Sequence, residues 1–168
     1  ALANAVAACV ASDRACQDLF AAARPPGRAA PDNVLQAVAN IVKGNQTELW
    51  MGNLDSIRDW GYAPEYTDGM WRMLQADAPE DFVLATGSAY TIRDFLTFAF
   101  AHAGLDWEDY VKFDPKFLRP TEVDELIGDA GKAKAKLDWS AKVLPPELAK
   151  IMVDADMARL DGAKEGQF

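Results

Sequence analysis

The sequence predicts a mixed α/β fold that is mostly helical and has a few short strands. Two patterns lead to this prediction: apolar residues recur at helical spacing in several segments, and short apolar runs end at glycine or proline. The chain has 168 residues, half of which are hydrophobic. It is therefore large enough to bury a core and too apolar to be disordered by composition.

Two helices are predicted in the first quarter of the chain. Residues 1–24 are rich in alanine and have a helical pattern, and Pro25 ends this helix because proline cannot continue it. A second helix is predicted from Asp32 to Val42. Asp32 has the side chain of an N-cap, and Gly44 is well placed as the C-terminal stop.

The middle of the chain alternates between strand and helix signals. Residues 48–51 are predicted to be a short strand, residues 62–75 a helix, and residues 82–85 a buried strand between proline and glycine. Thr91 and Asp94 resemble a capping box that opens the next helix, although Asp stands where Glu or Gln is preferred.

In the helix at 62–75, Tyr66, Met70, Met73 and Leu74 share helical spacing. We interpret this stripe as part of the core rather than as a cofactor contact, because apolar residues at this spacing usually pack inside.

The last third of the chain predicts further short elements. His102 lies near the end of the helix that Thr91 opens, where helix capping or dipole compensation is favoured over catalysis. A short strand is predicted at 107–113 and a short helix at 131–137 with its lysines in water. The last helix is predicted at 146–160, after a Pro-Pro pair that suits a first helical turn.

Charge and hydropathy limit the classes of partner. The net charge of -9 at pH 7 argues against nucleic acid, because a phosphate backbone would be repelled. A small phosphorylated ligand stays possible, since a few local arginines dominate at short range. No stretch has the roughly 20 apolar residues that a membrane-spanning helix needs.

The cysteines predict neither a disulfide nor a metal site. Cys9 and Cys16 lie seven residues apart. On a helix this is about 10 Å of rise, which is too far for a disulfide. We expect both to be reduced, as in a cytoplasmic protein. Together with His102, the single histidine, they do not have the spacing of a zinc site.

Two charged clusters are the best candidates for a binding site. Ten residues beginning at Gly52 contain a Gly52-Asn53 turn, two acids, a tryptophan and Arg58. An arginine fixed beside such a turn suits a phosphate, because its planar fork donates two parallel hydrogen bonds to one anion. The second cluster contains Arg119 and Glu122. Both clusters together predict a site for a phosphorylated, hydroxyl-rich ligand, and two ordinary surface turns are the alternative.

A longer series of motifs extends over roughly residues 34–160. Its members are Gly52-Asn53-Leu54-Asp55, Arg58-Asp59-Trp60-Gly61, Tyr66, Gly69-Met70-Trp71, Phe82-Val83, Ala85-Thr86-Gly87, Ala99 to His102, Gly104 to Glu108, Arg119 to Asp124, Gly128-Asp129 and Lys132-Ala133-Lys134 with Leu137. In order and spacing they closely resemble the GDP-mannose 4,6-dehydratases, a family of extended short-chain dehydrogenase/reductases (NAD-dependent epimerase/dehydratases).

This resemblance implies a lyase that binds GDP-mannose and tightly held NADP and produces GDP-4-keto-6-deoxymannose, the precursor of GDP-fucose. It also implies that Arg58, Arg119 and Glu122 contact the nucleotide sugar, and that Gly52 and Asn53 shape the guanosine end. The residue chemistry agrees, because two cations suit a diphosphate and a carboxylate accepts from ribose hydroxyls.

The resemblance covers only the C-terminal, substrate-binding part of such an enzyme, without the N-terminal Rossmann core. The chain has no glycine-rich strand–turn–helix for a dinucleotide. The family's catalytic tyrosine is followed four residues later by lysine, but no tyrosine here (Tyr62, Tyr66, Tyr90 or Tyr110) has that partner. The resemblance also implies a ligand-contacting lysine where Asn33 stands. We therefore expect no catalytic residue, no metal and no cofactor for this chain alone.

The expected organisation has three parts: an alanine-rich helical segment of unclear origin at 1–30, the sugar-nucleotide-binding portion at 31–160, and a flexible tail at 161–168. One hypothesis is a piece of the dehydratase that is inactive alone and pairs with its N-terminal half or forms a homo-oligomer. The alternative is a non-catalytic sugar-nucleotide-binding or subunit-interaction module. A small enzyme of unrelated chemistry has no motif to support it.

Overall fold

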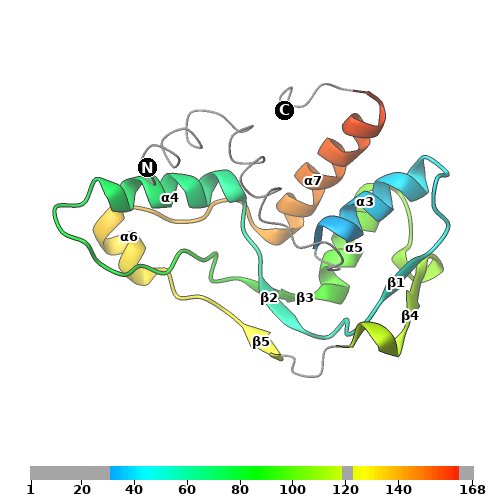
Figure 1. The fold of residues 1–168 in the computed structure, drawn as a ribbon, viewed down its shortest axis with the longest axis horizontal. Coiled ribbons are helices and arrows are strands. Elements are labelled where there is room, and N and C mark those ends of the chain that lie inside the picture. The colour runs from blue at the N-terminus through cyan, green and yellow to red at the C-terminus, as the bar shows by residue number, and fades with distance from the viewer. Residues whose placement is uncertain (1–30, 119–122, 163–168) are drawn as a thin grey trace. The chain divides into compact units, whose positions relative to one another are not determined.

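The structure is a computed structural model that describes residues 31–118 and 123–162 (Figure 1). The helix predicted at 1–24, both cysteines and nearly all of the predicted tail lie outside these residues. The described chain forms two compact units, which we treat separately. The α4–α6 unit contains residues 59–88 and 127–144, and the three-helix unit contains residues 31–58, 89–118, 123–126 and 145–162.

The three-helix unit is built on α3 (Pro31–Val42), α5 (Ile92–His102) and α7 (Pro145–Leu160), which pack against one another (Figure 1). Their contact faces form the core of this unit because they carry fully buried apolar side chains. These core residues are Leu35, Val38, Leu96, Phe100 and Val153.

One of the predicted helix ends is confirmed, and two others differ from the prediction. Thr91 Oγ1 accepts a hydrogen bond of 3.0 Å from the Asp94 amide, and the Asp94 carboxylate accepts one of 3.0 Å from the Thr91 amide, so the capping box is confirmed. His102 Nε2 lies 2.7 Å from the Asp154 carboxylate of α7. α3 begins one residue earlier than predicted, so Asp32 lies in its first turn rather than at the N-cap.

Two small sheets complete this unit. β1 (Leu49–Met51) pairs in parallel with β4 (Val111–Phe113). The predicted strand at 107–113 is therefore right only for its last three residues, since a short 3-10 helix occupies Trp107–Asp109. The other sheet has the order β3-β2-β5. Its strands are β3 (Ala89–Thr91), β2 (Ile57–Asp59) and β5 (Glu125–Leu126).

The α4–α6 unit contains α4 (Ala63–Leu74) and α6 (Gly131–Leu137), both of which were predicted. Trp139, which is 2% exposed, packs against α4, and its ring meets the Tyr66 ring edge to face with 5.6 Å between the ring centroids. Gly69 allows this approach, because a Cβ there would lie 3.0 Å from the Trp139 ring nitrogen. Small residues of α4 therefore face the interior of this unit.

Two predictions for this unit are wrong. Half of the stripe predicted on α4 is exposed: Met70 and Leu74 are 38% and 46% exposed, whereas Tyr66 and Met73 are half-buried. The fully buried residues of α4 are Thr67 and Gly69. The segment 82–85 is not a strand, because no strand among the described residues offers it a hydrogen-bonded ladder. No described helix is long and apolar enough to span a membrane.

The core of the three-helix unit yields a stability prediction. Phe100→Ala should lower the free energy of unfolding by about 3–5 kcal/mol, since it leaves a cavity at a fully buried side chain stacked near Tyr110. The matched control is Phe113→Ala, at a side chain that is 58% exposed, and should cost below about 1 kcal/mol. Urea unfolding measures both, and equal losses would contradict this placement of the core.

Candidate functional site

Arg58 lies on β2, the middle strand of the three-stranded sheet. It is in register with Leu126 of the parallel strand β5. Its side chain is half-buried, and one guanidinium nitrogen donates a hydrogen bond of 2.7 Å to the Ile57 carbonyl. The candidate phosphate-binding arginine is thus held on a strand rather than on a loose turn.

The first predicted cluster, residues 52–61, meets the main chain on either side of residues 119–122. Before the second cluster, the main chain of Phe117 passes so close to Gly52 that a Cβ there would lie 2.6 Å from the Phe117 carbonyl oxygen. At the end of the second cluster, the Asp124 carbonyl accepts a hydrogen bond of 2.8 Å from the Ile57 amide.

The described residues that flank positions 119–122 are therefore neighbours of the first cluster. Arg119 and Glu122 themselves lie outside the described residues. The residues that flank them, however, contact the turn before Arg58 and the strand that carries it. Gly52 is required here because the neighbouring main chain leaves no room for a side chain.

The Asn53 side chain stabilises the turn at residues 53–56 through two hydrogen bonds. Its side-chain oxygen accepts a hydrogen bond of 2.9 Å from the Asp55 amide, and its side-chain nitrogen donates one of 2.8 Å to Ser56 Oγ. Ser56 is 1% exposed, so this contact lies inside the protein. Asn53 thus shapes the turn, and part of its hydrogen-bonding capacity is already used there.

Arg93, at the start of α5, is a contact of this turn that the sequence did not reveal. Its guanidinium lies 2.8 Å from the Asp55 carboxylate and over the Trp107 ring at 5.5 Å, and its amide donates to the Leu54 carbonyl at 3.0 Å. The capping box marked the start of α5, but nothing in the local pattern indicated that α5 meets this turn.

Asp59, which follows Arg58, is the centre of a second network that the sequence did not reveal. Its Oδ1 accepts hydrogen bonds from the Thr86 amide at 3.0 Å and from Thr86 Oγ1 at 2.5 Å. Its Oδ2 accepts from the Gly87 amide at 3.0 Å and from the Gly128 amide at 3.3 Å. One carboxylate therefore joins three stretches of the α4–α6 unit.

Tyr66 lies on α4, and its ring packs against Gly61. It is not suited to act as a base near neutral pH. Its ring lies so close to Gly61 that a Cβ there would be 2.2 Å from Tyr66 Cε2. Burial raises the pKa of Tyr66 to about 12, with smaller contributions from the negative charges of Asp59 and Glu65. Its hydroxyl therefore keeps its proton at neutral pH.

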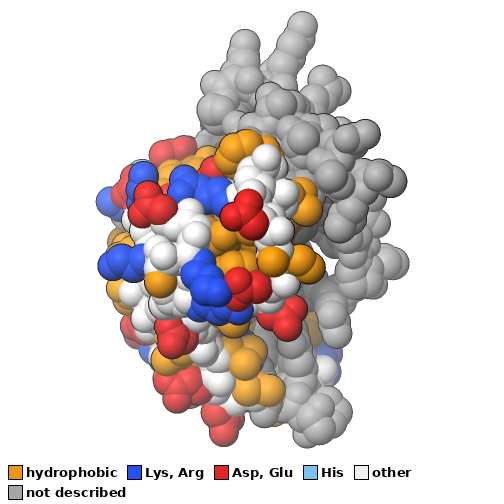
Figure 2. Space-filling model, turned by 90° about the vertical axis from the view of Figure 1, so that its left-hand side faces the viewer, with side chains coloured by type: hydrophobic (Ala, Val, Ile, Leu, Met, Phe, Trp, Pro, Cys, Tyr) orange, Lys and Arg blue, Asp and Glu red, His pale blue; other side chains and the backbone are white. Residues whose placement is uncertain are grey.

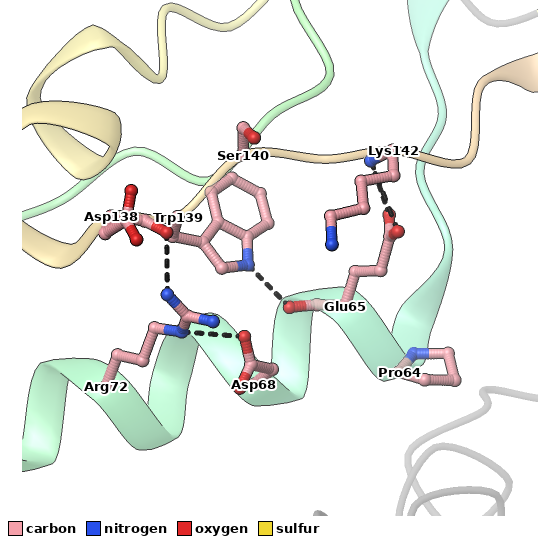
Figure 3. A pocket seen from close by; sticks show the side chains of 8 residues that line it. All are labelled: Pro64, Glu65, Asp68, Arg72, Asp138, Trp139, Ser140 and Lys142. Atoms are coloured by element: carbon pink, nitrogen blue, oxygen red, sulfur yellow. Dashed lines mark hydrogen bonds and ion pairs between the residues drawn. The ribbon is translucent and has the colours of Figure 1, made fainter.

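A pocket of about 500 Å³ lies in the α4–α6 unit, between α4 and the segment after α6 (Figure 3). Its polar groups bond mainly to one another. The Arg72 guanidinium donates to the Asp68 carboxylate at 2.8 Å, and the Trp139 ring nitrogen donates to the Glu65 carbonyl at 2.7 Å. Three acids and two bases line the pocket, and no predicted site residue does, so the pocket does not suit a diphosphate.

One face of this unit carries charges of both signs. Figure 2 shows basic and acidic side chains interspersed, with hydrophobic ones between them, on the face where α4 and α6 lie. Part of this mixture is paired: Lys136 Nζ lies 2.6 Å from the Glu80 carboxylate, and Lys132 Nζ lies 3.0 Å from it. No group of three metal-binding side chains occurs among the described residues.

The described residues do not fit the pyrophosphate of a dinucleotide. Such a site needs a strand, a glycine-rich turn and a helix whose first amides face the phosphates. Gly87, with φ of 69°, follows an extended segment but leads into β3, not into a helix. Gly131 opens α6, which is only seven residues long.

The family model and the sequence relatives agree on one family. The family model described as GDP-mannose 4,6 dehydratase matches residues 17–152. GDP-mannose 4,6 dehydratase 1 of Arabidopsis thaliana is 46% identical over 124 residues, which cover 74% of this chain and 34% of the plant protein. The human GDP-mannose 4,6 dehydratase is 43% identical over 141 residues, which cover 74% of this chain and 38% of the human protein. The chain thus spans little more than a third of these relatives.

Solved structures confirm the predicted fold class. RMD from Pseudomonas aeruginosa, solved with NADPH, superimposes with a TM-score of 0.69 at 15% identity, covering 77% of this chain and 42% of that one. The dTDP-glucose 4,6-dehydratase of Bacillus anthracis, solved with NAD, gives 0.64 at 15% identity, covering 82% and 42%. The chain therefore has the mixed α/β fold found in part of the extended short-chain dehydrogenase/reductases.

The raised pKa of Tyr66 predicts how stability depends on alkaline pH. The unfolded chain loses the Tyr66 proton near pH 10, whereas the folded chain loses it near pH 12. Its contribution is therefore fully present below pH 10 and is lost as the pH rises toward 12. Tyr66→Phe should remove this part of the decline in unfolding experiments, and should delete a tyrosinate absorbance step of the folded protein near pH 12. Tyr90→Phe is the matched control, and loss of that step in the control instead would contradict the assignment.

Proposed function

This chain belongs to the GDP-mannose 4,6-dehydratase family, and we propose that residues 31–160 are the GDP-mannose-binding portion of such an enzyme. The family reaction converts GDP-mannose to GDP-4-keto-6-deoxymannose. The observation that carries the proposal is the contact of the two charged clusters, because Gly52 and Ile57 of the first cluster meet the main chain on either side of Arg119 and Glu122.

The proposed roles follow from the chemistry of these side chains. Arg58 and Arg119 supply two cations for the diphosphate, and Glu122 accepts hydrogen bonds from ribose hydroxyls. Gly52 and Asn53 shape the part of the binding site that receives the guanosine of GDP-mannose. The turn that Asn53 closes supports this role, since a turn fixed by its own hydrogen bonds presents a preformed surface to a ligand.

We expect this stretch to bind the nucleotide sugar without converting it. The sequence has no tyrosine followed four residues later by lysine. The full-length family uses NADP, which we assign to the N-terminal half. The exposed face of α4, formed by Met70, Trp71 and Leu74 at 38%, 40% and 46% exposure, supports docking to that half or to a second copy.

A non-catalytic sugar-nucleotide-binding or subunit-interaction module is the alternative. It is favoured by the same missing tyrosine–lysine pair. The enzyme portion and a sugar-nucleotide-binding module both require that the site bind its ligand, whereas a subunit-interaction module does not. The enzyme portion and either module differ when an N-terminal dehydratase half is supplied in trans: only the enzyme portion should then restore formation of the 4-keto sugar.

Arg58→Ala tests the diphosphate contact. We expect it to weaken GDP-mannose binding by about 10- to 100-fold, because it removes a charge-assisted hydrogen bond. Isothermal titration calorimetry of the 168-residue chain measures this. Arg159→Ala is the matched control, since Arg159 lies on α7 and pairs with Asp156. Equal affinity in Arg58→Ala and the control, or no heat from the unchanged chain at millimolar ligand, would contradict the proposal.

Asn33→Lys tests the departure from the family pattern. A cation at this position should tighten GDP-mannose binding by about 10- to 100-fold at low salt, and added salt should reduce the gain. Asn45→Lys, just after α3, adds the same charge at an exposed position and is the control. If both variants gain equally, the effect is one of net charge and the assigned position is wrong.

A further inference from the structure

Three of the motifs that carry the family resemblance meet at one side chain. They are the Arg58-Asp59 pair, the Thr86-Gly87 pair and Gly128, and the Asp59 carboxylate bonds to the other two. Each of the three stretches also joins a strand of the β3-β2-β5 sheet, either directly or within two residues. Within the α4–α6 unit, the Asp59 carboxylate therefore holds the other two stretches together.

The hydrogen-bonding capacity of Asp59 is fully used within the protein. An ionised carboxylate has about four acceptor positions. Asp59 receives four donors: two from Thr86, one from Gly87 and one from Gly128. No acceptor position is left for a sugar hydroxyl, so the geometry argues against a direct ligand contact for Asp59.

The surrounding main chain is shaped for this contact. Gly87 has φ of 69°, a backbone conformation that residues other than glycine rarely adopt. A Cβ on Gly128 would lie 2.2 Å from the Ala85 Cβ. Both glycines are needed for their amides to reach the same carboxylate oxygen. The contact of Asp59 with these amides therefore depends on main-chain geometry that a side chain at position 87 or 128 would disturb.

We propose that Asp59 is a positioning residue for Arg58. Side chains of adjacent residues on a strand point to opposite faces. Because four hydrogen bonds fix the Asp59 side chain, the end of β2 is fixed and Arg58 is directed to the other face. The role of Arg58 in ligand binding rests on the proposed function, whereas the role of Asp59 as an anchor can be tested without any ligand.

The ligand-free test is amide hydrogen exchange by NMR on the 168-residue chain. Asp59→Asn keeps the shape but turns a nitrogen donor toward amide donors. Exchange at Thr86, Gly87 and Gly128 should accelerate by about tenfold or more. Asp129→Asn is the matched control, because the Asp129 carboxylate accepts from the Gly131 amide at 2.8 Å. Unchanged exchange in Asp59→Asn overturns the proposal.

A milder pair of variants covers the case in which Asp59→Asn does not fold. Thr86→Val removes the hydroxyl that donates to Asp59, whereas Thr86→Ser keeps it. Exchange at Gly87 and Gly128 should accelerate in the valine variant and return to the original rate in the serine variant. Equal exchange in both variants overturns the proposal.

The binding test is a double-mutant cycle with GDP-mannose. Asp59→Asn should weaken binding by about tenfold when Arg58 is present and cause no further loss in the Arg58→Ala background. Additive losses would assign Asp59 a direct ligand contact, and unchanged affinity would remove its link to Arg58; either result overturns the proposal. If the unchanged chain binds no GDP-mannose, the proposed function falls, and the exchange experiment still decides whether Asp59 is the anchor.

Discussion

The parallel pairing of β2 with β5 is the contact on which the arrangement of the candidate site depends. It places Ile57 in register with Glu125 and Arg58 in register with Leu126, so segments far apart in the sequence become neighbours. Strand pairing of this kind is cooperative with its surroundings, because an isolated two- or three-residue ladder is weak. The turn at 52–56 and the first amides of α5 support one side of the sheet, and the Asp59 junction extends the strand that Arg58 occupies.

The helices were predictable because their signals are local. The apolar spacing of α3, the Pro-Pro pair at the start of α7 and the Thr91–Asp94 capping box depend on residues within a few positions of one another. The strands were less predictable, because a strand forms only when it pairs with another strand, and that strand can lie far away in the sequence. The apolar run at 82–85 had the composition of a strand and no partner, whereas Ala89–Thr91 lacked the pattern and found one.

The same distinction holds for the candidate site. Arg58 and Gly52 were predicted because arginine beside a tight turn is a local pattern, and because the series of motifs resembles a family. The contacts of Asp59 with Thr86 and Gly128, and of Arg93 with Asp55, join segments that only the fold brings together. Residues that support a site from a distance therefore escape sequence reasoning, even when they lie inside a recognised motif.

The close approach at Gly52 also constrains how this protein can evolve. A new side chain at position 52 would collide with the carbonyl oxygen of Phe117, which is main chain and is present whatever residue stands at position 117. No second substitution at Phe117 can relieve that collision, as a smaller neighbour could for two clashing side chains. Change at this position requires a shift of the whole segment before Arg119, through an insertion, a deletion or a new backbone path. We therefore expect position 52 to vary together with the length of that segment rather than with the identity of any single residue.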